Sequence, residues 1–435
     1  MKLKNLVSQT IVATAVLASA TALNAQTLQQ AITAAQNHVP ALAAQQATAK
    51  AAAEQVGVAK SSRKPQVRFT ANGTFAEYDN NSTRVNGGDG YDSNSSQRFD
   101  IVATQRLFDF GDTSSQVSAA KHLYTASEHE VNAVREDVVL SVVNAYVNVL
   151  RFSKLDDIAA QNVRTGQDLA GIIDKQVEKG RSADVEQSLA QSQLAVTQAQ
   201  HRRQGGLLAE AKTQFTQLTG LQPDNLSELP ALQGAESFMT DRSIENINAN
   251  LGTAPSVQIA NSEREAATEF RDASKAKNLP TVDLELFAGQ GEDEDAVLGK
   301  NDSYGARVNL NWDLYAGGGN RAQQRAAAAE EVAAQNNVYE QYRQARQNVL
   351  TAVDKLTATK LELIYLDAEA SANVNVYKAY QQQLMSGRRS PLDVFVVLNN
   401  YNQSRLKLVD TQYRKRFEEY SVLAAYGKLA EQFGL

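Results

Sequence analysis

The strongest constraint on this chain is that its second half repeats its first. The segment QRLFDFGDTSSQVSAA (105–120) aligns with WDLYAGGGNRAQQRAA (312–327), which places Leu107 opposite Leu314 at an offset of 314 − 107 = 207 residues. Gly180 and Gly387 are also 387 − 180 = 207 residues apart. Anchors that share one offset and one order indicate an internal duplication, so the chain must fold as two similar units.

Each unit is predicted to contain very long helices. A tract from Gly111 to Lys179 would extend roughly 100 Å at the usual helical rise, and the sequence has only seven prolines to interrupt it. Apolar residues spaced by threes and fours predict packed coiled-coil seams. These residues are Val338, Tyr342, Ala345, Val349, Ala352, Leu356, Thr359, Leu363 and Leu366 in the second unit, and Val185, Leu189, Ser192, Val196 and Ala199 in the first.

Four strands are predicted, at about residues 66–77, 99–108, 281–289 and 304–314, because apolar and polar residues alternate there. Strands of about ten residues with one apolar face suit a transmembrane barrel, whereas an ordinary soluble hairpin with one wet face is the alternative. The long polar loops at 77–97 and 289–302 favour the barrel. The polar positions expected to face its lumen are Asp283, Glu285, Arg307, Asn309, Asn311 and Asp313.

Four strands are too few to close a barrel, and an open edge in lipid would leave backbone groups without hydrogen-bond partners. The chain is therefore expected to oligomerise. Three subunits would supply a twelve-stranded barrel, which lies within the usual range of strand numbers.

The first 25 residues look like an export signal, with a basic start at Lys2 and Lys4, a short apolar core and the small-residue site LNA before Gln26. A buried N-terminal helix is the alternative. No later segment approaches the ~20 consecutive apolar residues of a transmembrane helix. The formal charge of −6 becomes −6 − 2 = −8 without the two lysines, which disfavours nucleic acid as a partner.

The sequence offers little support for a cofactor, a metal or catalysis. It has no cysteine, which excludes disulfides, thiolate metal sites and a lipidated N-terminal cysteine. His122 and His129 lack a third ligand, and GQGEDED (289–295) lacks the regular spacing of a calcium loop. AGGGN (316–320) is not followed by the Lys-Ser/Thr pair of a phosphate-binding loop. We therefore predict no cofactor, no metal site and no enzymatic activity.

Several motifs together resemble the TolC-type outer-membrane channels of efflux and type I secretion. They are the LFDFG and LYAGGG turns, the proline before one strand of each unit, and the paired corners GRS (180–182) and GRRSPLDV (387–394). The resemblance implies a mostly helical fold with transmembrane β structure, in which a trimeric twelve-stranded barrel in the Gram-negative outer membrane continues as a helical tube through the periplasm. It also implies a belt around the tube at residues 221–245.

The resulting domain division is a signal peptide at 1–25, a first repeat at 26–245 and a second repeat at 246–435. The resemblance places both corners at the periplasmic tip, where a periplasmic adaptor docks. The corner residues expected to contact the adaptor are Gly180, Arg181, Ser182, Gly387, Ser390 and Pro391. From the residues alone, Ser390 is expected to cap the helix that follows, with Pro391 in its first turn.

The resemblance also implies a gate, in which Arg389 holds the tip closed through acidic partners. Asp393 would line the constriction, Asp184 is the candidate partner of Arg389, and Arg388 lies beside it. Counting from Gly180 instead selects Glu186 as the residue opposite Asp393. The alternative is that these charges are ordinary solvated residues of helix corners.

Two positions depart from the family pattern. Leu384 stands where the family has a gating tyrosine, and Val396 stands where some relatives have a second acidic residue. The resemblance therefore implies one acidic ring at the constriction where some relatives have two.

The expected function is a trimeric exit duct that receives cargo through the adaptor from an inner-membrane ABC or RND transporter. Two alternatives are a coiled-coil adhesin anchored by a small barrel and the periplasmic adaptor itself. The sequence leaves the cargo open among drugs, metals and proteins, with a slight preference for protein secretion.

Overall fold

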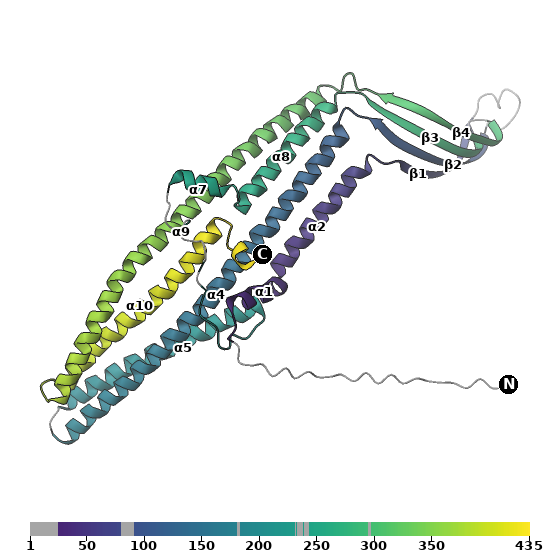
Figure 1. The fold of residues 1–435 in the computed structure, drawn as a ribbon. Helices are drawn as coiled ribbons and strands as arrows, with labels where there is room; N and C mark the ends of the chain where they lie inside the picture. The colour runs from purple at the N-terminus through teal and green to yellow at the C-terminus, as the bar shows by residue number, and fades with distance from the viewer. Residues whose placement is uncertain are drawn as a thin grey trace, which may run out of the picture.

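The computed structural model describes residues 25–79, 91–180, 183–230, 243–294 and 297–435, together with residues 232 and 238. Long helices lie side by side along one axis, and a four-stranded sheet extends from one end of them (Figure 1). The two helix corners lie at the opposite end. The expected export signal falls almost wholly on residues 1–24, outside the described residues, and stays a prediction.

Both units follow the same order of elements, as the duplication predicts. Each has a 67-residue helix, α4 or α9, which is about 100 Å long. A helix of 36 or 35 residues, α5 or α10, follows each corner. The helices are α1 (Leu28–His38), α2 (Pro40–Ser61), α4 (Asp112–Glu178), α5 (Asp184–Thr219), α7 (Ile244–Leu251), α8 (Pro255–Ala276), α9 (Gly319–Met385), α10 (Pro391–Ala425) and the short 3-10 turn η1 (Glu431–Phe433).

The sheet is antiparallel in the order β1 (Gln66–Asp79), β2 (Tyr91–Phe108), β3 (Thr281–Glu294) and β4 (Val297–Asn311). The four strands confirm the predicted alternation, and each extends further toward the polar loops than expected. The predicted end of the last strand at residue 314 is wrong. Asn311 pairs with Thr281, the first residue of β3, so no partner backbone remains beyond it. Trp312 instead donates its indole N–H to the Asn278 carbonyl oxygen at 3.0 Å.

The helices keep the lateral order of the strands. Near the sheet the contacts run α2–α4–α8–α9, and toward the corners they run α5–α4–α10–α9. One edge of this layer therefore carries β1, α2 and α5, and the other carries β4 and α9. Neither sheet edge has a strand partner within the described protomer.

The predicted seam on α9 is confirmed, whereas the stripe on α5 does not pack within the protomer. Val349 and Leu356 are at most 1 % exposed, but Val185 and Val196 are 68 % and 52 % exposed. The α5 helix packs on α4 through a different face, where Leu194 and Thr197 lie beside Gly166. The reason is that α5 lies at an edge of the layer and has a neighbouring helix on one side only.

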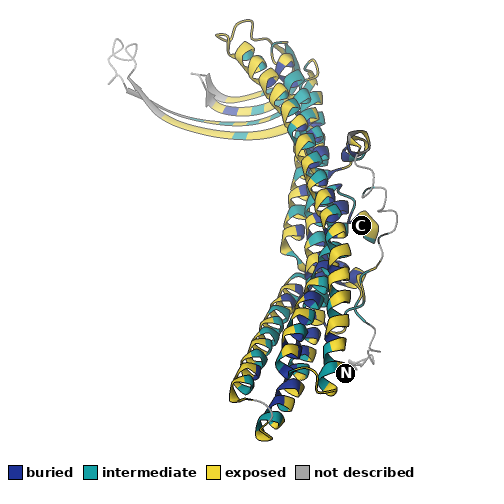
Figure 2. Cartoon of the chain, turned by 90° about the vertical axis from the view of Figure 1, so that its left-hand side faces the viewer, coloured by how far each residue is buried: buried dark blue, intermediate teal, exposed yellow. Residues whose placement is uncertain are grey.

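The main core lies at mid-length, where α1, the 221–230 segment and the C-terminal turn pack on α4 and α10. We call α1, the 221–230 segment, α7 and the C-terminal turn around η1 the belt, which includes more of the chain than the 221–245 stretch expected from the resemblance. The part of α4 inside this core is apolar enough to cross a membrane by composition, contrary to the expectation that no later segment approaches a transmembrane helix. Half of that stretch is buried in the protein. It is therefore a core segment. Figure 2 shows the C-terminus on one side of the helix layer, while the sheet bends toward the other side.

Candidate functional site

The corner between α9 and α10 is formed by a left-handed glycine and by backbone hydrogen bonds. Gly387 has φ = +68°, a left-handed conformation that glycine adopts without strain. The Gly387 and Arg388 N–H groups donate to the Leu384 and Gln383 carbonyl oxygens at 3.0 and 2.9 Å, which closes α9 in a Schellman motif. Gly180 has the same φ of +68° at the other corner, so the duplication preserved the turn.

The predicted cap of α10 is confirmed. The Ser390 side chain accepts a hydrogen bond from the Leu392 N–H at 3.2 Å, and Pro391 occupies the first turn. Ser390 Oγ also lies 3.4 Å from Glu186 Oε1 on α5, which ties the two corners together. In this contact Glu186, the residue selected by counting from Gly180, is the one that reaches the opposite corner. Arg181 and Ser182 lie outside the described residues.

Arg389 is held by its own helix pair. Its Nε donates to Gln383 Oε1 at 2.9 Å, its Nη1 lies 3.6 Å from Asp393 Oδ2, and its guanidinium stacks 4.2 Å from the centre of the Tyr380 ring. Sequence reasoning missed Tyr380 and Gln383, although both lie on the last turns of α9 beside the corner. Asp184 begins α5 and is not among the contacts of Arg389 within the protomer, so an Asp184–Arg389 pair between subunits stays a proposal.

One face of the sheet is polar and paired. Five of the six residues predicted for this face share it, because Asp283, Glu285 and Thr281 lie directly opposite Asn309, Arg307 and Asn311. Arg307 lies 2.5 Å from Glu285, and Asn309 also donates to Glu285 at 3.0 Å.

The prediction for the polar face was wrong for one residue and missed another. Asp313 lies beyond the end of β4, so its inclusion in the strand was wrong. Arg106 was missed, and its Nε lies 2.7 Å from Asp283 Oδ1. The alternation of β2 would have found it, since Arg106 lies two residues after Thr104 on the polar face.

The opposite face of the sheet is apolar and uncovered. Val67, Phe69, Ile101 and Val308 are between 51 % and 70 % exposed. At the helix end of the strands, Phe108, Trp312 and other aromatic residues are also exposed. Apolar bands of this kind, bounded by aromatic side chains, are the outer surface of membrane β-barrels.

Among the described residues, no group of three or more His, Asp or Glu side chains forms a candidate metal site. His122 instead lies 3.0 Å from Glu265 on α8.

The family model for the outer membrane efflux protein matches residues 31–221 and 246–428, one match in each repeated unit. The chain belongs to the outer membrane efflux protein family. This confirms the resemblance, the fold class and the outer-membrane location with an extension into the periplasm. It also favours an exit duct over the adhesin and adaptor alternatives. The exact domain boundaries stay predictions.

The chain is similar to Protein CyaE of Bordetella pertussis, at 26 % identity over 293 residues that cover 67 % of this chain and 60 % of that protein. It is 25 % identical over 439 residues to the outer membrane efflux protein BepC of Brucella suis, with 98 % and 92 % covered. Among solved structures, the CmeC outer membrane channel of Campylobacter jejuni has a TM-score of 0.79 at 16 % identity, with 92 % and 86 % covered. This last similarity supports the fold.

Proposed function

We propose that three copies of this chain close into one duct that carries cargo out of the periplasm across the outer membrane. The observation that carries the proposal is the sheet. It has one ion-paired polar face, one exposed apolar face and two edge strands whose outer sides have no strand partner among the described residues. A sheet in lipid must satisfy its edge groups, and joining β4 of each subunit to β1 of the next does so.

The same closure extends along the helices. Because α9 lies on the edge with β4 and α2 and α5 lie on the edge with β1, a neighbouring subunit would cover both helix edges together. The exposed stripe of Val185, Leu189 and Val196 on α5 then becomes a subunit contact, which explains why a coiled-coil spacing has no partner in the protomer.

The corners would form the periplasmic end of this duct. We place the docking of a periplasmic adaptor there, with an inner-membrane ABC or RND transporter supplying the cargo. The support is the position of both corners at the end furthest from the sheet (Figure 1) and the membership of the family.

We further propose that Arg389 is the gate residue. Its ion pair with Asp393 is solvent-accessible and weak, because the Arg389 side chain is 38 % exposed and that of Asp393 is 49 % exposed. Surface ion pairs of this kind contribute at most about 1 kcal/mol each. Three sets of these Arg389 contacts in a trimer would favour the closed tip and would still be weak enough for a partner to open it.

The test is to purify the full chain from outer membranes and measure both its mass and its ion conductance in planar bilayers. A trimer that produces discrete current steps is expected. A trimer without current would support the adhesin alternative, and a water-soluble monomer would contradict the proposal.

A further inference from the structure

The α10 helix has two faces that its neighbouring helices leave free. On one side Leu406 packs with Leu155 and Ile158 of α4, and on the other side Tyr401 stacks on Tyr377 of α9 with ring centres 5.6 Å apart. A helix between two neighbours in a layer keeps one free face on each side of the layer. These two faces of α10 differ in what lies over them.

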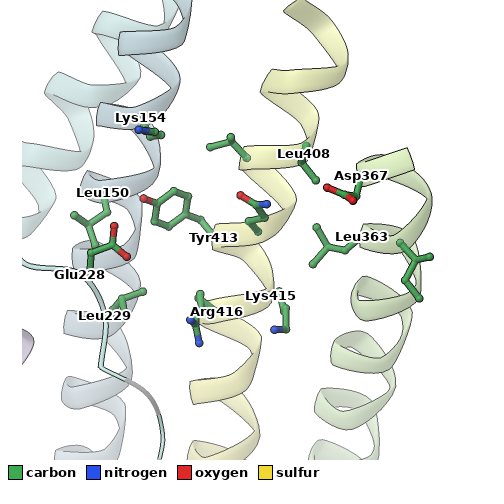
Figure 3. A pocket seen from close by; sticks show the side chains of 13 residues that line it. Leu150, Lys154, Glu228, Leu229, Leu363, Asp367, Leu408, Tyr413, Lys415 and Arg416 are labelled. Carbon is green, nitrogen blue, oxygen red and sulfur yellow. The ribbon is translucent and has the colours of Figure 1, made fainter. Parts of the chain in front are cut away.

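The belt crosses one free face. Glu228 and Leu229 lie with Val409, Tyr413 and Arg416 around a cavity of about 640 Å³ (Figure 3). This inference rests on the proposed trimer and on placing the belt outside its tube, which keeps the passage open. The other face of α10 therefore points into the passage.

The inward face can be located by helix geometry. Asn400, Gln403 and Lys407 each lie nine residues before a belt-side residue of α10, which is two and a half turns and therefore the opposite side of the helix. Steps of three and four residues continue this face along the helix. Its members are Asp393, Val396, Asn400, Gln403, Lys407, Asp410 and Arg414.

Charged side chains on this inward face lie beside side chains of opposite charge. Asp393 is beside Arg389 at 3.6 Å, and Asp410 lies 2.5 Å from Arg151 of α4. Arg414 is paired with Glu362 of α9.

The remaining charge on the face is Lys407. It lines a hollow of about 340 Å³ together with Glu369 of α9, so this hollow too contains both signs of charge.

Between these pairs the face is uncharged. Val396 is 59 % exposed one turn above Asp393. Further along, Gln403 donates to Gln200 of α5 at 3.2 Å, and Gln204 lines the same hollow. The narrow end of the passage therefore presents a paired carboxylate, an apolar side chain and then amides.

The polar face of the sheet has the same property. Arg106 is paired with Asp283, Arg307 with Glu285, and Arg98 with Asp100 at 2.7 Å. Among the residues of that face whose side chains the structure describes, Arg68 is the remaining charge.

We propose that the carboxylates on the wall of this duct are each balanced by a neighbouring cation. Val396 separates the paired Asp393 position from the amide-lined part of the passage. Rings of charged side chains of one sign make a pore prefer cations or anions. Each of these carboxylates has a cation beside it, so the duct discriminates weakly between cations and anions. It therefore suits cargo of either sign or of mixed charge.

The experiment measures the reversal potential of the purified full-length channel in planar bilayers under a KCl gradient. The wild-type K⁺/Cl⁻ permeability ratio is expected within roughly a factor of three of unity, because the carboxylates named above each have a cation beside them and Arg68 is the single unmatched charge among the described side chains of the sheet face. Val396→Asp adds three unpaired carboxylates to the passage and should raise the ratio several-fold. Gln412→Asp adds the same charge on the belt side of α10 and should leave the ratio unchanged.

The outcomes separate this inference from the proposed function. A protein that carries no current contradicts the duct itself. A wild-type channel that strongly prefers K⁺ or Cl⁻ overturns the balanced wall. If Val396→Asp leaves the ratio unchanged, or Gln412→Asp changes it equally, the assignment of the inward face is wrong.

Discussion

The belt and the corner at the end of α9 use polar groups in opposite ways. Under the belt, Glu136 of α4 is only 8 % exposed. Its carboxylate accepts hydrogen bonds from the Leu429 and Ala430 N–H groups of the C-terminal segment at 3.1 and 2.9 Å. At the corner, the ion pair of Arg389 with Asp393 joins exposed groups, and the guanidinium stacks on the half-buried Tyr380 ring. Buried polar contacts are costly to break, whereas exposed ones are weak.

The belt is further fixed by two buried tyrosines. The Tyr146 hydroxyl lies 2.8 Å from the Gln26 carbonyl oxygen and 2.7 Å from that of Ser227, and the Tyr420 hydroxyl donates to the Pro230 carbonyl oxygen at 3.0 Å. Each of these tyrosines ties one long helix to the belt. The comparison teaches that buried hydrogen bonds fix the middle of the helix layer, whereas the contacts at its corner end are weaker.

The largest expected effect is at Glu136. Glu136→Leu would leave two buried N–H groups without an acceptor, which costs about 2–4 kcal/mol in total. Hydrogen exchange should show the Leu429 and Ala430 amides exchanging about a hundredfold faster, since 1.4 kcal/mol corresponds to a factor of ten. Glu136→Gln keeps one acceptor oxygen and should have a smaller effect. Unchanged exchange in the leucine variant would show that the belt does not depend on this carboxylate.

The next effect is a loss of stability at alkaline pH from Tyr420. Burial raises the pKa of Tyr420 to about 12 from its ordinary value of 10.0. Its stabilisation is complete below pH 10, where tyrosine is neutral in both folded and unfolded chains, and is lost as the pH rises to 12. The loss is about 2–3 kcal/mol, at 1.36 kcal/mol for each pKa unit. Thermal melting at several pH values should show this decline. Tyr420→Phe should reduce it without removing it, because burial also raises the pKa of Tyr146, Tyr377 and Tyr413. An equal decline in Tyr420→Phe would assign it to other groups.

The sequence predicted those features that depend on local pattern. Strand alternation, the seam of α9, the cap at Ser390 and the paired corner glycines all follow from residues a few positions apart. The contacts that were missed join distant segments. Glu136 binds backbone groups almost three hundred residues away, and no side-chain pattern marks a carboxylate that accepts from backbone N–H groups.

The α5 stripe shows a different limit of sequence reasoning. Its spacing of threes and fours correctly indicates a helix with an apolar seam, but the spacing does not say which helix covers that seam. Val185 and Leu189 remain exposed because no helix of the described protomer covers that face of α5. Position in the layer depends on how all the elements assemble, which periodicity does not encode.

A smaller effect is expected at Tyr146. Tyr146→Phe removes a hydroxyl that lies within hydrogen-bond distance of the Gln26 and Ser227 carbonyl oxygens. Its loss should lower the stability of the belt by about 1 kcal/mol. A lowered melting temperature with unchanged ion conductance is expected, because in the proposed trimer the belt lies outside the passage. Altered conductance would show that the belt is coupled to the tip. Tyr413→Phe serves as a control, since Tyr413 lies on the same side of the layer at the cavity under Glu228.

The smallest effect on stability, below about 1 kcal/mol, is expected at the corner, where the contacts are exposed. Tyr380→Leu removes the ring on which the Arg389 guanidinium stacks, and Arg389→Gln removes the cation itself. Neither should change the melting temperature measurably, yet both should raise single-channel conductance if Arg389 holds the tip closed, with the larger increase in Arg389→Gln. Arg388→Gln is the matched control, because the Arg388 backbone N–H closes the corner and survives the substitution. Equal conductance in all three variants would remove Arg389 from the gate. A large fall in melting temperature would instead show that the corner, like the belt, is a fixed part of the tube.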